Sequence, residues 1–299
     1  MFVPMSSPQE IEDRAAVARP MIERILGQPV GAMLHQPFGH GNIVFKLPDL
    51  DSPLVAKTSD RAEAFLHTAA NLSTLQELGI PVPNWVGRDD DGQLAVIVLE
   101  WIEGEDLAYA LPEMTFEQRR TLAYQIADIQ RRVGTLPDGG GFGWVPIGER
   151  GPFGSWFEIV DRDLHRLSAR FVARLEPALS ELRDRLRQIP PTPFLDDVTV
   201  KNVIVRDGCL NGIVDLDWIC YGDPLYWLAL TETTVMLDVG ETGMDYCDEL
   251  RRLWFDGAES PRELFLYEAM FAASFLEREL PPDQHHRMRG FFEFRLTDT

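Results

Sequence analysis

The sequence predicts an α+β chain in which short strands dominate the first hundred residues and helices dominate the rest. Strand-like segments at 32–36, 42–47 and 54–58 follow one another closely, and a fourth lies at 93–101. From Leu107 onward the apolar residues recur with the helical period. We therefore expect a domain boundary near residue 100, with one domain at 1–100 and a second at 101–299.

The composition is typical of an ordinary globular protein. Hydrophobic residues make up 45% and charged residues 25% of the 299 residues. There is no apolar run of about 18 residues and no signal-peptide pattern, so we expect a cytoplasmic protein without a membrane span. The net charge of −20 disfavours nucleic acid as a partner, because phosphate binding needs a basic patch, and it is compatible with a cationic substrate. The sequence leaves the oligomeric state open.

A helix is expected over residues 7–26, ahead of the strands. Ser7 with Glu10 three residues later is a capping-box pattern, and Gly27 is a typical helix end. Pro20 lies inside this segment, and we expect it to kink the helix or split it in two, because proline lacks the N–H group.

Other helices are predicted from similar signals. Asp60 with Glu63 is a second capping-box pattern, which predicts a helix over 60–78, and Thr115 with Gln118 predicts a helix that runs to Arg132. The glycine-rich stretch 139–144 is expected to be an irregular loop. Further helical stretches, one of them either single or double, are expected at 155–189, from 223 onward, and at 241–255, 261–279 and 282–295.

The segment 194–217, FLDDVTVKNVIVRDGCLNGIVDLD, carries the strongest chemical signal. It predicts a loop, a strand, a turn and a returning strand, at 194–202, 203–206, 207–208 and 213–216. Asp197 and Asn202 lie on the loop and Asp215 on the returning strand, so their oxygens are expected to converge at one end of the hairpin. Mg²⁺ prefers such hard oxygen ligands and usually takes only one or two from the protein. Asn202 and Asp215 are therefore candidate Mg²⁺ ligands, and Asp197 a candidate to face a substrate hydroxyl.

This segment resembles the aminoglycoside phosphotransferase and choline kinase-like family, whose loop reads HGDxxxxN and is followed by a strand that ends in Asp. Asp197, Asn202 and Asp215 match that pattern in order and spacing. Leu195 and Asp196 replace its His and Gly. The resemblance covers about residues 30–235 and implies a two-lobed protein kinase-like fold, with a small, mainly antiparallel β N-lobe at 1–100 and a larger, mainly helical C-lobe at 101–299.

The same resemblance assigns a nucleotide half to the first lobe. Gly39 and Gly41, in the turn between the first two strands, match a loop where small residues let the backbone approach phosphates. Lys57 matches the phosphate-pairing lysine of the third strand. The backbone of the hinge would bind the adenine edge, with Glu100, Trp101 and Ile102 in that place.

Two further positions depart from the family pattern. After Gly222-Asp223-Pro224 the family has a second Asp, where this chain has Trp227. Kinase-like folds also pair the strand lysine with a helix Glu, but Glu63 lies more than a turn too early. Either Glu63 reaches Lys57 from the start of its helix or the pair is absent.

The resemblance implies an ATP-dependent kinase that moves the γ-phosphate to a hydroxyl of a small molecule, such as an aminoglycoside, an amino alcohol or a sugar, with ATP and Mg²⁺ as cofactors. Asp197 would orient the hydroxyl and accept its proton, while Asn202 and Asp215 would bind Mg²⁺. Asp217, two residues beyond Asp215 on the expected strand, is a further metal or supporting carboxylate or else a simple exposed acid.

Lys201 is a candidate that the family pattern does not contain. Only three of the 28 basic residues are lysines, so a lysine suggests a need for a compact charge. Lys201 directly precedes Asn202, and we expect it to neutralise charge on the transferring phosphoryl group.

Two other functions stay open at this point. One is a catalytically weak or inactive nucleotide-binding protein, which the residues Leu195 and Trp227 and the missing helix Glu motivate. The other is transfer of the nucleotide instead of phosphate.

Overall fold

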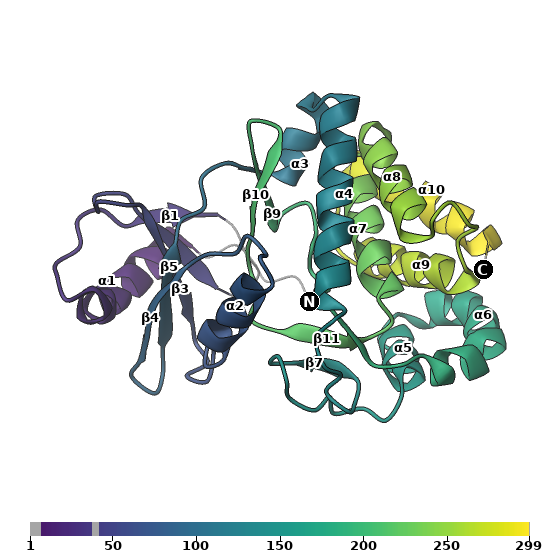
Figure 1. The fold of residues 1–299 in the computed structure, drawn as a ribbon, viewed down its shortest axis with the longest axis horizontal. Helices are drawn as coiled ribbons and strands as arrows, with labels where there is room; N and C mark the ends of the chain where they lie inside the picture. The colour runs from purple at the N-terminus through teal and green to yellow at the C-terminus, as the bar shows by residue number, and fades with distance from the viewer. Residues whose placement is uncertain (1–6, 38–41, 299) are drawn as a thin grey trace. The chain divides into compact units, whose positions relative to one another are not determined.

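The computed structural model describes residues 7–37 and 42–298, and its contacts divide the chain into two compact units (Figure 1). The first unit comprises Met1–Glu77 and Pro81–Glu103, and the second comprises Leu78–Ile80 and Gly104–Thr299. The candidate loop residues Gly39 and Gly41 lie outside the described residues. Among the helices within the described ranges, none is long and apolar enough to cross a membrane.

An antiparallel sheet in the order β1-β2-β3-β5-β4 forms the first unit. Its strands are β1 (Leu34–Gln36), β2 (Ile43–Leu47), β3 (Leu54–Ser59), β4 (Trp85–Asp90) and β5 (Ala95–Glu100). β5 is buried from Ala95 to Leu99, so both faces of the sheet are covered there. Helix α1 (Pro8–Leu26) packs Ala18, Met21 and Ile22 against one face, and Figure 1 shows α2 (Thr68–Glu77) on the other side.

Helix α1 begins and ends where the sequence predicts. Ser7 forms the capping box with Glu10, and Gly27 takes the left-handed conformation, with φ 68°. The helix continues through Pro20, so the alternative of two helices is wrong. Apolar side chains are buried on both sides of Pro20, which stabilises the helix across the missing hydrogen bond.

The predicted start of the second helix at Asp60 is wrong, because α2 begins at Thr68. Phe65, between them, has φ 64°, which is incompatible with a helix interior. Arg88 of β4 also donates a hydrogen bond to the carbonyl of Ala64 at 2.8 Å. A contact from a distant strand therefore occupies a carbonyl that a longer helix would use.

The second unit is mainly helical. Its helices are α3 (Leu107–Ala110), η1 (Leu111–Glu113), α4 (Phe116–Val133), α5 (Trp156–Leu164), α6 (Ala169–Gln188), α7 (Leu225–Asp238), η2 (Glu241–Gly243), α8 (Met244–Trp254), α9 (Arg262–Leu276) and α10 (Pro282–Asp298). The capping box of Thr115 with Gln118 at the start of α4 is confirmed, and the stretch 155–189 forms two helices. Trp227 is fully buried in α7 and packs edge-on against Trp254 of α8.

Buried charges fix the position of α7 among its neighbours. Glu232 of α7 and Glu268 of α9 are fully buried, and Arg251 of α8 donates hydrogen bonds to both. Arg295 of α10 lies 2.9 Å from the Glu268 carboxylate. Two cations thus balance two anions in the interior, where an unpaired charge is strongly destabilising.

Two small sheets contain strands of the segment 194–217. One contains β6 (Glu105–Asp106), β9 (Val203–Arg206) and β10 (Cys209–Ile213), and the other contains β7 (Gly143–Val145), β8 (Thr192–Phe194) and β11 (Ile219–Gly222). The expected tight turn is confirmed, since Asp207 and Gly208 have φ 52° and 74°. The glycine-rich stretch, expected to be irregular, contributes Gly143 and Trp144 to β7.

The returning strand lies earlier than predicted, at Cys209–Ile213 instead of 213–216. Pairing begins directly after the two-residue turn and ends where Ile213 faces Val203. Asp215 and Asp217 therefore follow the strand, and the expectation that they share one strand face is wrong. The apolar alternation of the sequence continues past the last paired residue, and this explains the error.

Candidate active site

A short loop between β8 and β9 holds Asp197 and Asn202 together. The Asn202 side-chain amide donates to the Asp197 carbonyl at 2.9 Å, and the Asn202 backbone N–H donates to the Thr199 carbonyl at 3.1 Å. The Thr199 hydroxyl donates to the Asp197 carboxylate at 3.1 Å. The carboxylate and the amide are therefore fixed within one closed turn.

Backbone pairing brings Asp215 to the same end of the hairpin. The Val214 N–H donates to the Asn202 carbonyl at 2.9 Å, so the residue that follows lies beside Asn202. Asp215 is exposed and has φ 66°, a conformation that is uncommon for residues other than glycine. Such strained residues cluster at functional sites. The structure thus brings Asp197, Asn202 and Asp215 to one end of the hairpin.

The carboxyl of Asp197 lies in an acidic setting. Loss of hydration raises its pKa to about 7, and the negative charges of Asp196 and Asp215 act in the same direction. The hydrogen bond from Thr199 opposes this rise. A carboxyl whose pKa lies near the operating pH is suited to accept a proton from a hydroxyl.

The carboxylate of Asp196 has a hydrogen-bond partner on strand β7. The Trp144 indole N–H of β7 donates to its carboxylate, and burial raises the pKa of Asp196 to about 6. Trp144 packs edge-on against Tyr226, whose hydroxyl donates to Asp163 at 3.1 Å. The second carboxylate of the loop is thereby tied to an aromatic cluster of the second unit.

Lys201 forms an ion pair at the end of α7. Its ammonium lies 3.3 Å from the Asp238 carboxylate, and its side chain is exposed. Burial raises the pKa of Asp106, which caps α3 by accepting from the Tyr109 N–H at 3.3 Å, and the charge of Lys201 opposes this rise. Lys201 therefore neutralises acidic groups at two helix ends next to the loop.

In the first unit, Lys57 lies in the middle of the sheet. It is half-buried on β3, opposite Val44 of β2 and Ile97 of β5. Glu63, the candidate partner, lies in the irregular segment before α2 and is exposed. The sequence is therefore correct in placing Lys57 on the third strand and wrong in placing Glu63 on a helix.

The predicted hinge follows β5. The Glu100 N–H donates to the Asn84 carbonyl at 2.9 Å and the Trp101 N–H to the Pro53 carbonyl at 3.1 Å. The Ile102 N–H has no hydrogen-bond partner within the described part of the chain. Of these three amide donors, Ile102 alone is left to bind a ligand edge.

The donor set at the loop suits a hard cation. Because the Asn202 amide nitrogen donates to Asp197, its Oδ1 is the atom that remains to ligate, and Asp215 directly follows the residue that bonds to the Asn202 carbonyl. Within residues 7–37 and 42–298, no group of three or more His, Cys, Asp or Glu side chains is arranged to hold a metal. An amide and a carboxylate fit Mg²⁺, which takes its other ligands from water and phosphates.

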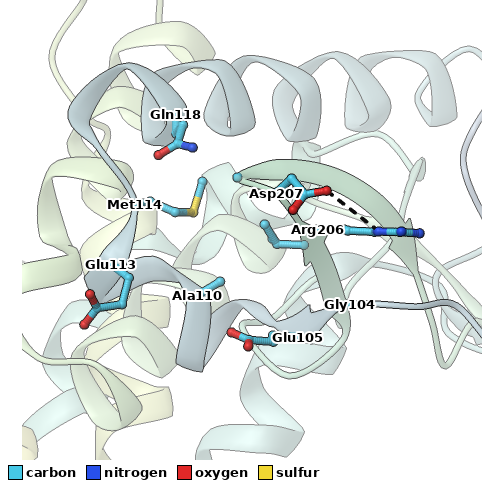
Figure 2. A pocket seen from close by; sticks show the side chains of 10 residues that line it. Gly104, Glu105, Ala110, Glu113, Met114, Gln118, Arg206 and Asp207 are labelled. Carbon is cyan, nitrogen blue, oxygen red and sulfur yellow. Dashed lines mark ion pairs between the residues drawn. The ribbon is translucent and has the colours of Figure 1, made fainter.

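A pocket of about 330 Å³ lies at the other end of the hairpin (Figure 2). It is lined by Val205 and Arg206 of β9, by the turn residues Asp207 and Gly208, and by Glu105 and Glu113, both exposed. Arg206 pairs with Asp207 there. Only Val203 and Ile204 of β9 lie between Asn202 and the nearest lining residue, Val205, a span of about 10 Å at the usual rise of a strand. It is therefore separate from the Asp197 group.

Sequence reasoning missed two buried residues that hold the loop. Gln130 of α4 is hydrogen-bonded to both backbone groups of Leu195, and the Thr231 hydroxyl of α7 donates to the Val198 carbonyl at 3.0 Å. A signal was present for Gln130, since a polar residue stood among Ile126, Ile129 and other core positions of a helix.

Comparisons with known proteins agree with this geometry. The chain matches the model of the phosphotransferase enzyme family over residues 36–263. No curated protein sequence matches it.

Several solved structures have a similar fold. A thermostable mutant of the aminoglycoside phosphotransferase APH(4)-Ia, in a ternary complex with ADP and hygromycin B, is 16% identical, with a TM-score of 0.72 over 94% of this chain and 98% of that chain. APH(3'')-Id from Streptomyces rimosus is 18% identical, with a TM-score of 0.61 over 88% and 98%. A streptomycin–ATP complex of APH(2")-IIa is 13% identical, with a TM-score of 0.62 over 95% and 96%.

The structural matches confirm the predicted protein kinase-like fold. The family match extends over most of the sequence and includes β2 to α8, with the whole loop that carries Asp197. The predicted class, a small-molecule kinase, is confirmed with it, and the acceptor is undetermined. The chain belongs to the phosphotransferase enzyme family.

Proposed function

We propose that this protein is a Mg²⁺-dependent kinase that transfers the γ-phosphate of ATP to a hydroxyl of a small molecule in the cytoplasm. The observation that carries the proposal is the fixed group of Asp197, Asn202 and Asp215 at one end of the hairpin. Similar structures that contain ADP with hygromycin B, or ATP with streptomycin, support a nucleotide donor and a hydroxyl-rich acceptor.

Asp197 is the residue that meets the acceptor in this proposal. Phosphoryl transfer asks the protein mainly to position groups and to neutralise charge, so the base has to orient the hydroxyl and accept its proton late. Without a bound cation the pKa of Asp197 is about 7, and a cation at Asn202 and Asp215 would favour the ionised carboxylate that accepts the proton.

Asn202 and Asp215 are the proposed Mg²⁺ ligands, and Asp217, which is half-buried, is a third candidate. Bound Mg²⁺ would neutralise the phosphate charge that develops during transfer. Asn202 also holds the Asp197 carbonyl, so one side chain links the metal position to the base. Lys201 directly precedes Asn202 in the chain, pairs with Asp238, and is proposed to act on the transferring phosphoryl group.

The proposed nucleotide half belongs to a lobe at 1–100, and the acceptor half to a lobe at 101–299. Lys57 pairs with the α- and β-phosphates, and the Ile102 amide, with the backbone of Glu100 and Trp101, receives the adenine edge. Gly39 and Gly41 are proposed to approach the phosphates from the loop before β2.

A thermal-shift measurement with ATP, with and without Mg²⁺, tests the nucleotide site. We expect a Mg²⁺-dependent rise in Tm, because a ligand that binds only the folded state stabilises it. Asp215→Ala should abolish the Mg²⁺-dependent part, and the matched control Asp207→Ala, at the turn end of the hairpin, should retain it.

Turnover of ATP against a panel of aminoglycosides, amino alcohols and sugars tests the transfer. Phosphate on a hydroxyl of one acceptor is the expected product. A Mg²⁺-dependent shift without turnover on any acceptor would favour the inactive nucleotide-binding alternative, and pyrophosphate release would indicate nucleotide transfer.

A further inference from the structure

Gln130 forms two hydrogen bonds with the main chain of one residue in the loop. Its side-chain amide nitrogen donates to the Leu195 carbonyl at 2.7 Å, and its side-chain oxygen accepts from the Leu195 N–H at 3.1 Å. Both residues are only 1% exposed. The Gln130 side chain therefore satisfies the donor and the acceptor of a single buried residue at once.

The two hydrogen bonds of Gln130 extend the hydrogen-bond pattern of a sheet by one residue. Leu195 directly follows β8, which is the edge strand of the β7-β11-β8 sheet. The side-chain amide of Gln130 offers Leu195 the same donor and acceptor that a neighbouring strand would offer. The chain is therefore held by α4 at the point where it leaves the sheet and enters the loop.

A second buried bond holds the loop just after Asp197. The Thr231 hydroxyl donates to the Val198 carbonyl at 3.0 Å, and both residues are buried. Asp197 is thus bracketed, with Leu195 fixed by α4 two residues before it and Val198 fixed by α7 one residue after it. Buried hydrogen bonds of this kind are costly to lose, because the freed peptide groups have no water to replace them.

We propose that Gln130 is a positioning residue for phosphoryl transfer, which acts through the main chain of Leu195 to aim the Asp197 carboxylate. The inference rests on the proposed function, in which Asp197 meets the acceptor hydroxyl. In the described structure the side-chain hydrogen bonds of Gln130 go only to Leu195, so we expect its loss to change where Asp197 lies and to leave the nucleotide contacts proposed for the first unit intact.

The test compares Gln130→Met with Gln125→Met, a control in the same helix whose side-chain oxygen is buried and lacks a hydrogen-bond partner in the described structure. We expect Gln130→Met to lower kcat for ADP formation from MgATP about 100-fold, since small misplacements of a catalytic group have effects of this size. The KM for MgATP should change by less than about threefold. Gln125→Met should change neither quantity by more than about twofold.

A double-mutant cycle separates positioning from a general structural defect. If Gln130 acts through Asp197, then Asp197→Ala with Gln130→Met should be no slower than Asp197→Ala alone. Hydrogen exchange gives a readout that does not depend on activity, and the peptide that spans 194–203 should exchange faster in Gln130→Met only. Additive losses in the cycle, or unchanged exchange in that peptide, would overturn the proposal.

The outcomes also separate this inference from the proposed function. If Asp197→Ala leaves turnover unchanged, the proposed role of Asp197 fails, and the inference fails with it. If Asp197→Ala abolishes turnover while Gln130→Met does not lower kcat, the inference alone fails. Should Gln130→Met not fold, Gln130→Asn takes its place, because it keeps a neutral amide and is one methylene too short to bond both backbone groups of Leu195.

Discussion

The two ends of the β9–β10 hairpin differ in how their polar groups are held. At the loop end, the Asn202 side chain donates to the Asp197 carbonyl and Thr199 donates to the Asp197 carboxylate, and buried side chains from two helices fix the chain around them. At the turn end, Arg206 and Asp207 are exposed and separated by 3.8 Å. The turn end nevertheless has the pocket (Figure 2).

This difference shows that the presence of a pocket does not by itself identify the catalytic site. A catalytic side chain needs a fixed orientation toward the substrate, and neighbouring residues that are themselves held in place provide that orientation. The loop end satisfies this requirement through buried main-chain bonds, and the pocket at the turn end is lined mostly by solvated side chains. Variants at the two ends should therefore differ sharply in effect.

The largest effect is expected for Asp197→Asn at the loop end. The amide keeps the shape of the side chain but cannot accept the proton, so turnover should fall on the order of 100- to 10,000-fold. Steady-state kinetics on the acceptor found by the panel measure this. Asp207→Asn, the same change at the turn end, serves as the control, and equal losses in both variants would end the distinction between the two ends.

A smaller loss is expected for Lys201→Met. If Lys201 acts on the phosphoryl group as proposed, removing its positive charge should lower kcat about 100-fold, with nucleotide affinity changed by less than about threefold. Separate measurements of kcat and of ATP binding by calorimetry check this. Asp238→Asn keeps the lysine and removes its ion-pair partner, so it should retain most of the turnover. Unchanged kcat in Lys201→Met would leave that residue a purely structural ion pair.

A modest effect on stability is expected from Asp223, which directly follows β11. Burial raises its pKa to about 6, and the Tyr267 hydroxyl donates to it at 2.8 Å. Its folded pKa lies above its unfolded one, so its protonation stabilises the fold fully below about pH 4, and this contribution is lost as the pH rises through about 6. Unfolding in urea should show wild type losing on the order of 2 kcal/mol across that window relative to Asp223→Asn. A constant difference between the two proteins would contradict the assignment.

The smallest effect is expected at the pocket. Glu105→Gln combined with Glu113→Gln should leave kcat and the KM values within about twofold, because surface substitutions away from fixed networks are nearly neutral. Acceptor KM is the sensitive measurement here. A large rise in the acceptor KM would indicate that the acceptor binds at the turn end, and would contradict the difference drawn between the two ends of the hairpin.

Local signals in the sequence were enough for much of the fold. Ser7 and Thr115 each start a helix through a contact three residues away, and the turn at Asp207 and Gly208 needs only its own two residues. Where a distant residue decides, prediction failed. The start of α2 depends on Arg88, more than twenty residues further on, which no local pattern at Asp60 reveals.

In the candidate site, too, the features that nearby residues determine could be predicted, and those that distant residues determine could not. The spacing of Asp197, Asn202 and Asp215 was readable, because it lies within one short segment. The conformation of Asp215 was not, since it depends on where the pairing of β10 stops. The contribution of Gln130 was also hidden, because 65 residues separate it from Leu195 in the chain.

The two hydrogen bonds between Gln130 and the main chain of Leu195 have a consequence for how divergent members of this family are recognised. Gln130 binds the peptide groups of position 195 and makes no demand on the side chain there. These two hydrogen bonds therefore do not require a histidine at that site, and the residue there needs only to be apolar enough to be buried. A motif search keyed to the His and Gly of the loop would pass over such a chain, whereas one that pairs the Asp and Asn with a buried amide in the preceding long helix would retrieve it.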